Sequence, residues 1–535
     1  MARLCDGNGG FTEERDCAAE GKVCDPDYVC VTCIPGSTVC ENGVAKHCNS
    51  DGTGFDREYV CDELQGMTCT SNGCFGACTP EALGDSYIGC DYYPTVTFNP
   101  VSSVFSFVVA VGNAGDQPAS VLVQRNGVDE ASRIVAPGSL ELIKLPWVPE
   151  LKGPDAVGST PQNPGASRVV KNGAYRLRST QPVTVYQFNP LEYRTGNTYS
   201  YTNDAALLLP ATTLTGDYTI LSWASESATG GFYAVTATQD NTVVSIQGSG
   251  QIVPGAGLAA SGSGQVVLNA GDVLEVLGAF GPEPTILNPQ PPPGSDISGT
   301  RIFADKPVQV ISGHSCANVP RTKVACDHIE ETVFPAQTLG RDYLVTIPAA
   351  PGGGTSPHTL RIVAVQPNTK VSFDPPIRAE ATLNPGQAPL EIARITQDVR
   401  IVADKEILIG QYMHGAEDVP SGKGDPSLSY AIATEQFRKS YIFVASSTYD
   451  QNFVNVIAKE GTTVLLDGQE IPQSSFKPIG SSGYAVARVQ LSQTDVHTAS
   501  SDEPFGIVTY GYGEYTSYMY PGGLDLQKIA PPPPR

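Results

Sequence analysis

The side chains best suited to catalysis are few and scattered in this sequence. Six histidines are present, and two of them, His314 and His414, end equivalent predicted strands. Because other residue types fill that place elsewhere in the chain, we expect a structural role for both imidazoles. No Gly-x-Ser-x-Gly elbow and no His-Glu-x-x-His motif occurs. The sequence therefore predicts no catalytic residues, no metal site and no cofactor.

The aspartates recur at one place in a repeated pattern instead of converging on a site. Asp305, Asp404 and Asp502 each stand between two short apolar stretches. The simplest account is a turn in which Asp hydrogen-bonds its own backbone two residues on. A glycosidase would need two site-specific carboxylates within about 10 Å of each other. A carbohydrate-active enzyme on a β scaffold is therefore kept only as the alternative function.

Tyrosines are concentrated near the C-terminal end, where five fall within eleven residues. Tyrosine has a large apolar face and a polar tip, which suits both sugar stacking and protein contact. Tyr510 and Tyr512 lie two apart on a predicted strand, so they share a face, and we expect that face to be the core. We predict that Tyr515, Tyr518 and Tyr520 lie beyond this strand and form the binding surface.

Twelve of the 14 cysteines lie in the first 90 residues and form two copies of one spacing. Small modules this dense in cysteine are stapled by disulfides because their cores are small, and we favour disulfides over zinc. The pairing itself is left open. The cysteines predicted to be in disulfides here are Cys5, Cys17, Cys24, Cys30, Cys33, Cys40, Cys48, Cys61, Cys69, Cys74, Cys78 and Cys90.

Three further expectations follow from cysteine positions. Cys316 and Cys326 are predicted to pair with each other, and Cys90 is a candidate for a bridge back into the cysteine-rich segment. Cys40 has no counterpart in the first copy, whose equivalent would precede residue 1. We therefore expect that the chain begins inside a longer protein, and that the signal peptide is not in this chain.

One stretch, Thr300–His314, organises the rest of the chain because it occurs four times. It reads as two short strands joined at Asp305-Lys306, with Pro307 opening the second. Each recurrence closes a unit that opens with a tyrosine and contains about seven short strands. The opening tyrosines are Tyr87, Tyr218, Tyr343 and Tyr441.

This pattern predicts an all-β protein with four tandem repeats after a small disulfide-rich segment. Each repeat is β-sandwich-like, or the four form a closed propeller-like ring in which the last stretch completes the first unit. Two Gly- and Pro-rich inserts, 151–168 and 281–299, are predicted surface loops. The predicted segments are 1–79 (cysteine-rich modules), 80–192, 193–317, 318–415 and 416–529 (β repeats) and 530–535 (Pro-rich tail).

The composition limits the possible partners. The net charge is −22, and such an acidic chain is a poor match for nucleic acid. The sequence holds no run of eighteen apolar residues, so no membrane span is predicted. Dense cysteine indicates an extracellular or cell-surface location.

Four motifs together resemble the IgG Fc-binding protein N-terminal domain family, over roughly 80–529. They are ADKPVQVISGH (304–314), VFPAQTLGRDYLV (333–345), GNAGDQPASV (112–121) and YGYGEYTSYMYPGGL (510–524). The resemblance implies a bacterial surface-protein member, in which such domains follow cysteine-rich modules. The family name implies antibody binding, but no residue motif carries that role over. We therefore predict a non-catalytic adhesion or binding module for an extracellular protein or glycan.

Overall fold

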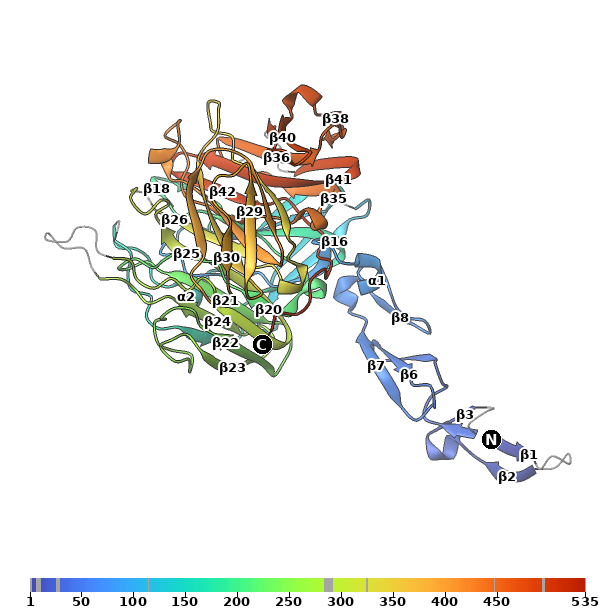
Figure 1. Ribbon diagram of the computed structural model, residues 1–535. Coiled ribbons are helices and arrows are strands. Elements are labelled where there is room, and N and C mark those ends of the chain that lie inside the picture. The colour runs from blue at the N-terminus through green and yellow to red at the C-terminus, as the bar shows by residue number, and fades with distance from the viewer. Residues whose placement is uncertain are drawn as a thin grey trace. The chain divides into compact units, whose positions relative to one another are not determined.

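The computed structural model describes residues 2–5, 11–25, 29–113, 115–158, 160–282, 292–323, 326–446, 448–492 and 496–534. The chain is all-β and divides into two compact units (Figure 1). The small unit comprises 1–84 and 178–182, and the large unit comprises 85–177 and 183–535. No helix among the described residues is both long and apolar enough to cross a membrane.

The small unit is built from short hairpins and one three-stranded sheet, β5-β6-β7. Disulfides join Cys17 to Cys30, Cys33 to Cys48, Cys40 to Cys69 and Cys61 to Cys74. Its elements are β1 (Ala2–Cys5), β2 (Phe11–Arg15), β3 (Val23–Asp25), β4 (Val29–Val31), β5 (Thr38–Glu41), β6 (Val44–Cys48), β7 (Phe55–Val60), β8 (Thr68–Thr70), β9 (Gly73–Phe75) and helix α1 (Pro80–Leu83).

The disulfides agree with the spacing in the sequence. Cys17–Cys30 in the first copy and Cys61–Cys74 in the second join the same two aligned positions. Cys78 and Cys90 are also disulfide-bonded. Cys24 is the exception, because it is an exposed free thiol among the described residues. The side chain of Cys5 lies outside the described residues.

The first half of the large unit forms two sheets, each arranged around one long strand, β16 or β25. The strands of the first are β10 (Gly89–Tyr92), β11 (Phe107–Gly112), β12 (Ala119–Arg125), β13 (Val128–Val135), β14 (Leu140–Leu145), β16 (Arg176–Phe188) and β19 (Ala205–Leu207). Those of the second are β15 (Arg168–Val170), β20 (Thr215–Thr219), β21 (Gly231–Ala237), β22 (Thr242–Gln247), β23 (Gly264–Leu268), β24 (Val273–Leu277), β25 (Arg301–Ala317) and β26 (Asp327–Thr332). Helix α2 (Pro149–Lys152) and the hairpin β17 (Arg194–Thr195) and β18 (Thr198–Tyr199) lie outside these sheets.

The second half repeats this plan, once as two separate sheets and once as one sheet around β41. The former comprise β27 (Asp342–Val345), β28 (His358–Ala364), β29 (Thr369–Asp374), β30 (Ala381–Leu383), β31 (Leu390–Ile395), β32 (Val399–Ala403), β33 (Ile407–Met413) and β34 (Leu428–Tyr430). The latter comprises β35 (Arg438–Val444), β36 (Gln451–Lys459), β37 (Leu465–Leu466), β38 (Gln469–Glu470), β39 (Lys477–Pro478), β40 (Tyr484–Gln490), β41 (Val496–Gly513) and β42 (Thr516–Pro521).

One pairing recurs in all four parts of the large unit. The strands β11, β21, β28 and β36 each lie antiparallel between two others, one of which is the organising strand β16, β25, β33 or β41. This recurrence supports the division into four repeats, and we keep the predicted boundaries of these repeats as a proposal.

The predicted pair of short strands is one continuous strand in most of the chain. β25 runs through Asp305 and Pro307 without a break, and only β32 and β33 are separate. Two of the three recurring aspartates bond the backbone of a neighbouring strand. Asp305 Oδ1 accepts from the amide of Val243 at 2.8 Å, and Asp404 Oδ1 accepts from the amide of Lys370 at 2.8 Å. Asp305 and Asp404 therefore tie their segments to the strand beside them.

The recurring tyrosine bonds the backbone three residues after the aspartate. The hydroxyls of Tyr218 and Tyr343 donate to the carbonyls of Val308 and Ile407, both at 2.6 Å. In the first part, this role belongs not to Tyr87 but to Tyr92, which donates to Val183 at 2.7 Å. Each phenol is buried, so each bond satisfies a hydroxyl that water cannot reach.

The large unit closes on itself, which supports the ring over a linear array of sandwiches. The four strands β19, β26, β34 and β42, here called the central connectors, contact one another in a cycle: β19 with β26, β26 with β34, β34 with β42, and β42 with β19. At the seam, Tyr87 donates its amide to Leu524, and Leu526 donates to Asp85. Figure 1 shows β36, β40 and β41 across the unit from β22 and β23.

A single carboxylate joins three of the central connectors. Asp204 Oδ2 accepts from the amides of Glu330 and Leu428, at 3.0 and 3.1 Å. Its Oδ1 accepts from Ser427 Oγ and from the amide of Ala205. Asp204 is fully buried, and burial raises the pKa of its carboxyl, while the four hydrogen bonds oppose that shift in part.

Of the two predicted inserts, the first is held to the neighbouring sheet. Ser167 Oγ donates to the carbonyl of Val253 at 2.6 Å and accepts from the amide of Leu277 at 3.1 Å. In the second insert, residues 283–291 lie outside the described residues.

Candidate binding surface

The structure separates the three tyrosines of the predicted binding surface. Strand β41 turns at Glu514 and Tyr515 and returns as β42, so Tyr518 and Tyr520 lie within a strand. Both are fully buried, because β42 is a central connector covered by its neighbours. Tyr518 donates to Asn452 Oδ1 at 2.7 Å, and Tyr520 donates to the carbonyl of Val444. Neither ring is available at the surface.

Tyr515 is the exposed one of the three. It lies in a group of tyrosines whose other members were not predicted from the sequence. Its ring centroid is 6.4 Å from that of Tyr201, which lies 5.5 Å from Tyr199 and 5.9 Å from Tyr193. The exposed fraction is 45% for Tyr515 and 47% for Tyr201. Tyr193, Tyr199, Tyr201 and Tyr515 are called the tyrosine patch below.

Two rings of the patch are carried by strained backbone. Tyr201 has φ 52° and Tyr515 has φ 55°. A bulky L-residue in this left-handed region costs on the order of 1–3 kcal/mol, and such residues cluster at functional sites. Asn fills five of the eight other left-handed non-glycine positions in the described chain. The fold therefore holds two tyrosines outward at the expense of local stability.

Hydrogen bonds from two buried asparagine side chains hold the loop that carries Tyr201. Asn203 Nδ2 donates to the carbonyls of Pro190 and Glu192, at 3.0 and 3.1 Å. Asn99 Nδ2 donates to the carbonyl of Thr202 at 3.0 Å. Because both amides are buried, these bonds fix the loop before any partner arrives, which lowers the entropic cost of binding.

Charged groups border the aromatic patch. The Arg194 guanidinium lies 5.2 Å from the centroid of the Tyr199 ring. Lys423 pairs with Asp450 at 2.8 Å, and both are about half exposed. Burial, followed by the neighbouring Tyr201 and Glu514, raises the pKa of Tyr193, so its phenol is a neutral donor near pH 7. The result is an apolar centre with a polar rim, which is the anatomy of a protein-binding surface.

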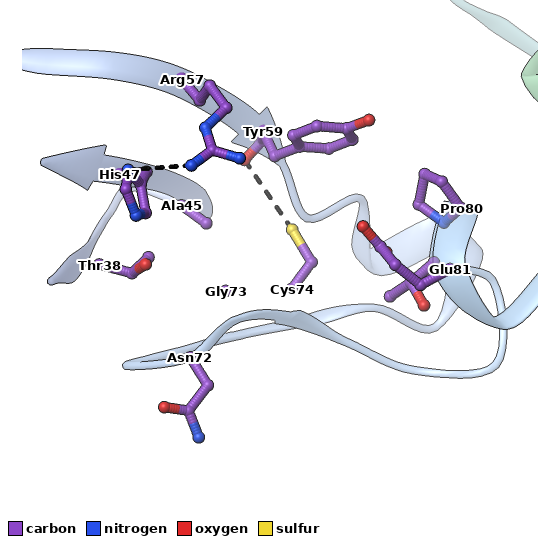
Figure 2. Close-up of a pocket in the computed structure, with 11 residues that line it drawn as sticks. Thr38, Ala45, His47, Arg57, Tyr59, Asn72, Gly73, Cys74, Pro80 and Glu81 are labelled. Atoms are coloured by element: carbon purple, nitrogen blue, oxygen red, sulfur yellow. Dashed lines mark hydrogen bonds between the residues drawn. The ribbon is translucent and has the colours of Figure 1, made fainter. Parts of the chain in front are cut away.

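A second candidate is an open pocket of about 470 Å³ in the small unit. Figure 2 shows Arg57 beside His47 on one side and Pro80 and Glu81 on the other. Arg57 Nη2 lies 3.4 Å from His47 Nδ1, which also contacts Asp56 Oδ1 at 2.9 Å. The volume suits a small ligand, but the lining contains a single carboxylate. Two-carboxylate glycoside hydrolysis needs a second acid beside Glu81, which is the one carboxylate among the described lining residues.

His314 and His414, the two histidines in equivalent positions, are both buried. Burial lowers the pKa of His314 to about 3, and His314 Nδ1 accepts from the amide of Cys316 at 3.1 Å. His414 Nε2 lies 3.0 Å from Thr359 Oγ1, and its Nδ1 lies 2.5 Å from Asp418 Oδ2. Both imidazoles are closed off from solvent, so neither can serve a substrate.

A sequence signal for the missed tyrosines does exist. The stretch EYRTGNTYSYTN (192–203) holds three tyrosines around a Gly-Asn turn. Aromatic residues around a short hairpin turn, β17–β18 here, have few neighbours to cover them. What the sequence could not show is that Tyr515 joins them, because that contact depends on ring closure.

Comparison with known proteins finds a family match over most of the large unit. A family model described as "IgGFc binding protein" matches residues 204–511. A human protein named IgGFc-binding protein is 25% identical over 246 residues, which are 45% of this chain and 4% of that protein. The chain thus spans a small fraction of the relative's length. An α-L-rhamnosidase from Aspergillus terreus is 9% identical over 68% of this chain and 50% of its own, with a TM-score of 0.11, and carries no argument about fold or function.

Proposed function

We propose that this chain, which belongs to the IgGFc binding protein family, is an extracellular module that recognises a protein partner through the tyrosine patch. One observation carries the assignment: Tyr201 and Tyr515 are half-exposed, touch each other, and are both held in left-handed backbone. Strain kept in this way is typical of sites that are shaped for a ligand.

The chemistry of the patch favours a protein surface as partner. Tyrosine gives large contact area for little side-chain entropy, and it is enriched among the residues that dominate binding energy. Arg194 and Glu514 at its edge supply charges of both signs for orientation. A glycan that stacks on the same rings is the other partner class that this surface suits.

The location follows from the covalent chemistry. At least four disulfides cross-link the small unit, and Cys316–Cys326 adds one in the large unit. Such bonds persist outside the cell. Attachment to a cell surface, an adhesive role and the bacterial origin implied by the resemblance stay predictions.

The test is a binding measurement with two matched sets of variants. IgG Fc, the partner in the family's name, is immobilised, and the oxidised chain is passed over it; a glycan array is probed in parallel. We expect Tyr201→Ser with Tyr515→Ser to weaken binding at least tenfold. Tyr59→Ser is the control, because Tyr59 is 53% exposed but lies in the small-unit pocket.

The two candidate surfaces give opposite results in this experiment. Loss of binding with Tyr59→Ser alone would move the site to the small-unit pocket. If the wild-type chain binds a glycan but not Fc, and the double variant loses that signal, the patch is right and the partner class is wrong. Wild-type affinity in a folded double variant would overturn the proposal.

A further inference from the structure

Five carboxyl groups lie together at the centre of the large unit, on and beside the central connectors. They are Asp204, Asp327, Glu330, Glu331 and Asp425, and each is at most 1% exposed. Among the described residues, the only ion pair that any of them makes joins Glu330 to His328, at 3.1 Å. Burying this much acid without compensating charge is costly, so each carboxyl must be accounted for.

Hydrogen bonds account for two of the five and for one oxygen of a third. Asp204 accepts four, as described above. Glu330 accepts from Gln187 Nε2 at 2.8 Å and also contacts Thr97 and His328. Glu331 Oε1 accepts from the amides of Leu207 and Thr332, while its Oε2 has no hydrogen-bond partner among the described residues. The bonded oxygens of these three groups hold the connectors together.

Asp327 and Asp425 are different. Neither oxygen of Asp327, and not Oδ1 of Asp425, has a hydrogen-bond partner in the described chain. The amides of His328 and Asn203 lie near Asp327, but they do not reach hydrogen-bonding geometry with its oxygens. Burial raises the pKa of both carboxyls, and the charge of Asp425 raises that of Asp327 further.

Asp327 and Asp425 occupy equivalent positions relative to two neighbouring central connectors, β26 and β34. Asp327 and Asp425 stand three residues before Glu330 and Leu428, whose amides share one oxygen of Asp204. They also stand at equal distances in sequence from Pro335 and Ala433, which precede matching 3-10 turns. Because β26 and β34 touch, their equivalent aspartates lie next to each other.

Two hydroxyl oxygens, those of Thr516 and Tyr449, lie near Asp327 and Asp425. The amide of Asp425 donates to Ser517 Oγ at 3.0 Å, which fixes Asp425 beside the start of β42. There Thr516 Oγ1 is buried and has no hydrogen-bond partner. The buried Tyr449 hydroxyl interacts with Thr516 and lies near Asp327, although neither hydroxyl reaches full hydrogen-bonding geometry in the described chain. Four side chains from separate elements thus have oxygens in one buried region whose hydrogen bonding is incomplete among the described residues.

We propose that Asp327 and Asp425, with the hydroxyls of Thr516 and Tyr449, bind a divalent cation of the calcium class at the centre of the ring. Two carboxylates balance two positive charges, and an all-oxygen donor set selects Ca²⁺ over Zn²⁺. The described residues hold no group of three or more His, Cys, Asp and Glu arranged around a metal, so the remaining ligands must be neutral oxygens.

The site adjoins the tyrosine patch without depending on its function. Thr516 directly follows Tyr515, and the Asn203 amide near Asp327 lies two residues after Tyr201. A bound cation would therefore anchor the bases of both loops that carry strained tyrosines. It would also fasten β26, β34 and β42 to one another, as Asp204 does for the first three connectors.

The probes are Ca²⁺, Mg²⁺ and Tb³⁺, applied to the full chain after chelation by EDTA. We expect Ca²⁺ to raise the melting temperature in the submillimolar range, Mg²⁺ to act far more weakly, and Tb³⁺ to luminesce when tyrosine is excited. Asp327→Asn with Asp425→Asn should abolish both responses. Asp450→Asn, which removes an exposed acid near the patch, should retain both.

A second variant, Thr516→Val, keeps the test valid if the Asp327→Asn and Asp425→Asn double variant does not fold. Thr516→Val keeps the side-chain shape and removes only the hydroxyl, and we expect it to weaken Ca²⁺ binding at least tenfold. The absence of any Ca²⁺ or Tb³⁺ response in the wild-type chain up to about 10 mM, roughly tenfold above the weakest extracellular sites, would overturn the proposal. So would an unchanged response in the double variant. Either result would leave Asp327 and Asp425 as protonated carboxylic acids.

Discussion

Tyr87 bonds both backbone groups of Ile442, although 355 residues separate them. The Tyr87 hydroxyl donates to the Ile442 carbonyl and accepts from its amide, each at 3.0 Å. The Tyr87 ring is fully buried, and the neighbouring Ser86 forms an isolated antiparallel bridge with Asp525. This contact joins the beginning of the ring to its end.

Replacing Tyr87 with Phe should therefore weaken closure. The change leaves the part-buried Ile442 amide without a partner and leaves its carbonyl only the Tyr186 hydroxyl at 3.4 Å. An unsatisfied group costs about 1–3 kcal/mol, so we expect the free energy of unfolding in urea to fall by about 1–3 kcal/mol. Tyr59→Phe is the control, since Tyr59 is exposed, and should change it by less than about 0.5 kcal/mol. Equal values for both variants would mean that Tyr87 does not hold the ring.

The left-handed backbone of Tyr515 leads to a prediction about thermal stability. Asn tolerates the left-handed region that Tyr515 occupies at φ 55°. Tyr515→Asn should keep or raise the melting temperature, because it relieves strain and removes an exposed ring. Tyr518→Asn in the following strand, β42, should lower it sharply, since that ring is buried and truncating a buried aromatic costs about 3–5 kcal/mol. Differential scanning fluorimetry on both variants separates surface from core.

Those two tyrosines also show how far the sequence could lead. Period-two patterning predicted an all-β chain and the burial of Tyr510 and Tyr512, because both follow from local geometry. It failed for Tyr518 and Tyr520, because their burial depends on β42 closing a ring with strands from three other parts of the chain. The same closure brings Tyr201 to Tyr515. Contacts of this kind have no local signature.

The disulfide between Cys316 and Cys326 should stabilise the large unit. The two cysteines are 10 residues apart in sequence, and closing a loop of this size in the unfolded chain is worth about 3 kcal/mol. Replacing both with Ser should lower the free energy of unfolding by roughly 2–3 kcal/mol. Ser at Cys24, an exposed thiol, serves as the control. A loss below about 0.5 kcal/mol would show that the loop is already restrained without the bond.

The last prediction concerns Glu275, a carboxyl group in the middle of β24. It is 1% exposed, its Oε1 has no hydrogen-bond partner in the described chain, and Arg168 Nε stands 3.8 Å from its Oε2. Burial raises the pKa of Glu275 to about 8, with Arg168 opposing the shift only in part. The folded chain therefore holds a proton on Glu275 that the unfolded chain releases near pH 4.5.

The sign of the pH dependence follows from that difference. Between pH 4.5 and 8 the folded state binds one more proton at this site than the unfolded state does, so stability falls as the pH rises. The slope is at most about 1.4 kcal/mol per pH unit, and it ends above the folded-state pKa. Glu275→Gln stays neutral and should lose this slope, so its advantage over the wild type should grow from pH 5 to pH 8. The measurement is urea unfolding across that range, with Glu514→Gln as the exposed control. Parallel wild-type and Glu275→Gln profiles would mean that Glu275 is ionised in the folded chain, with Arg168 compensating the charge.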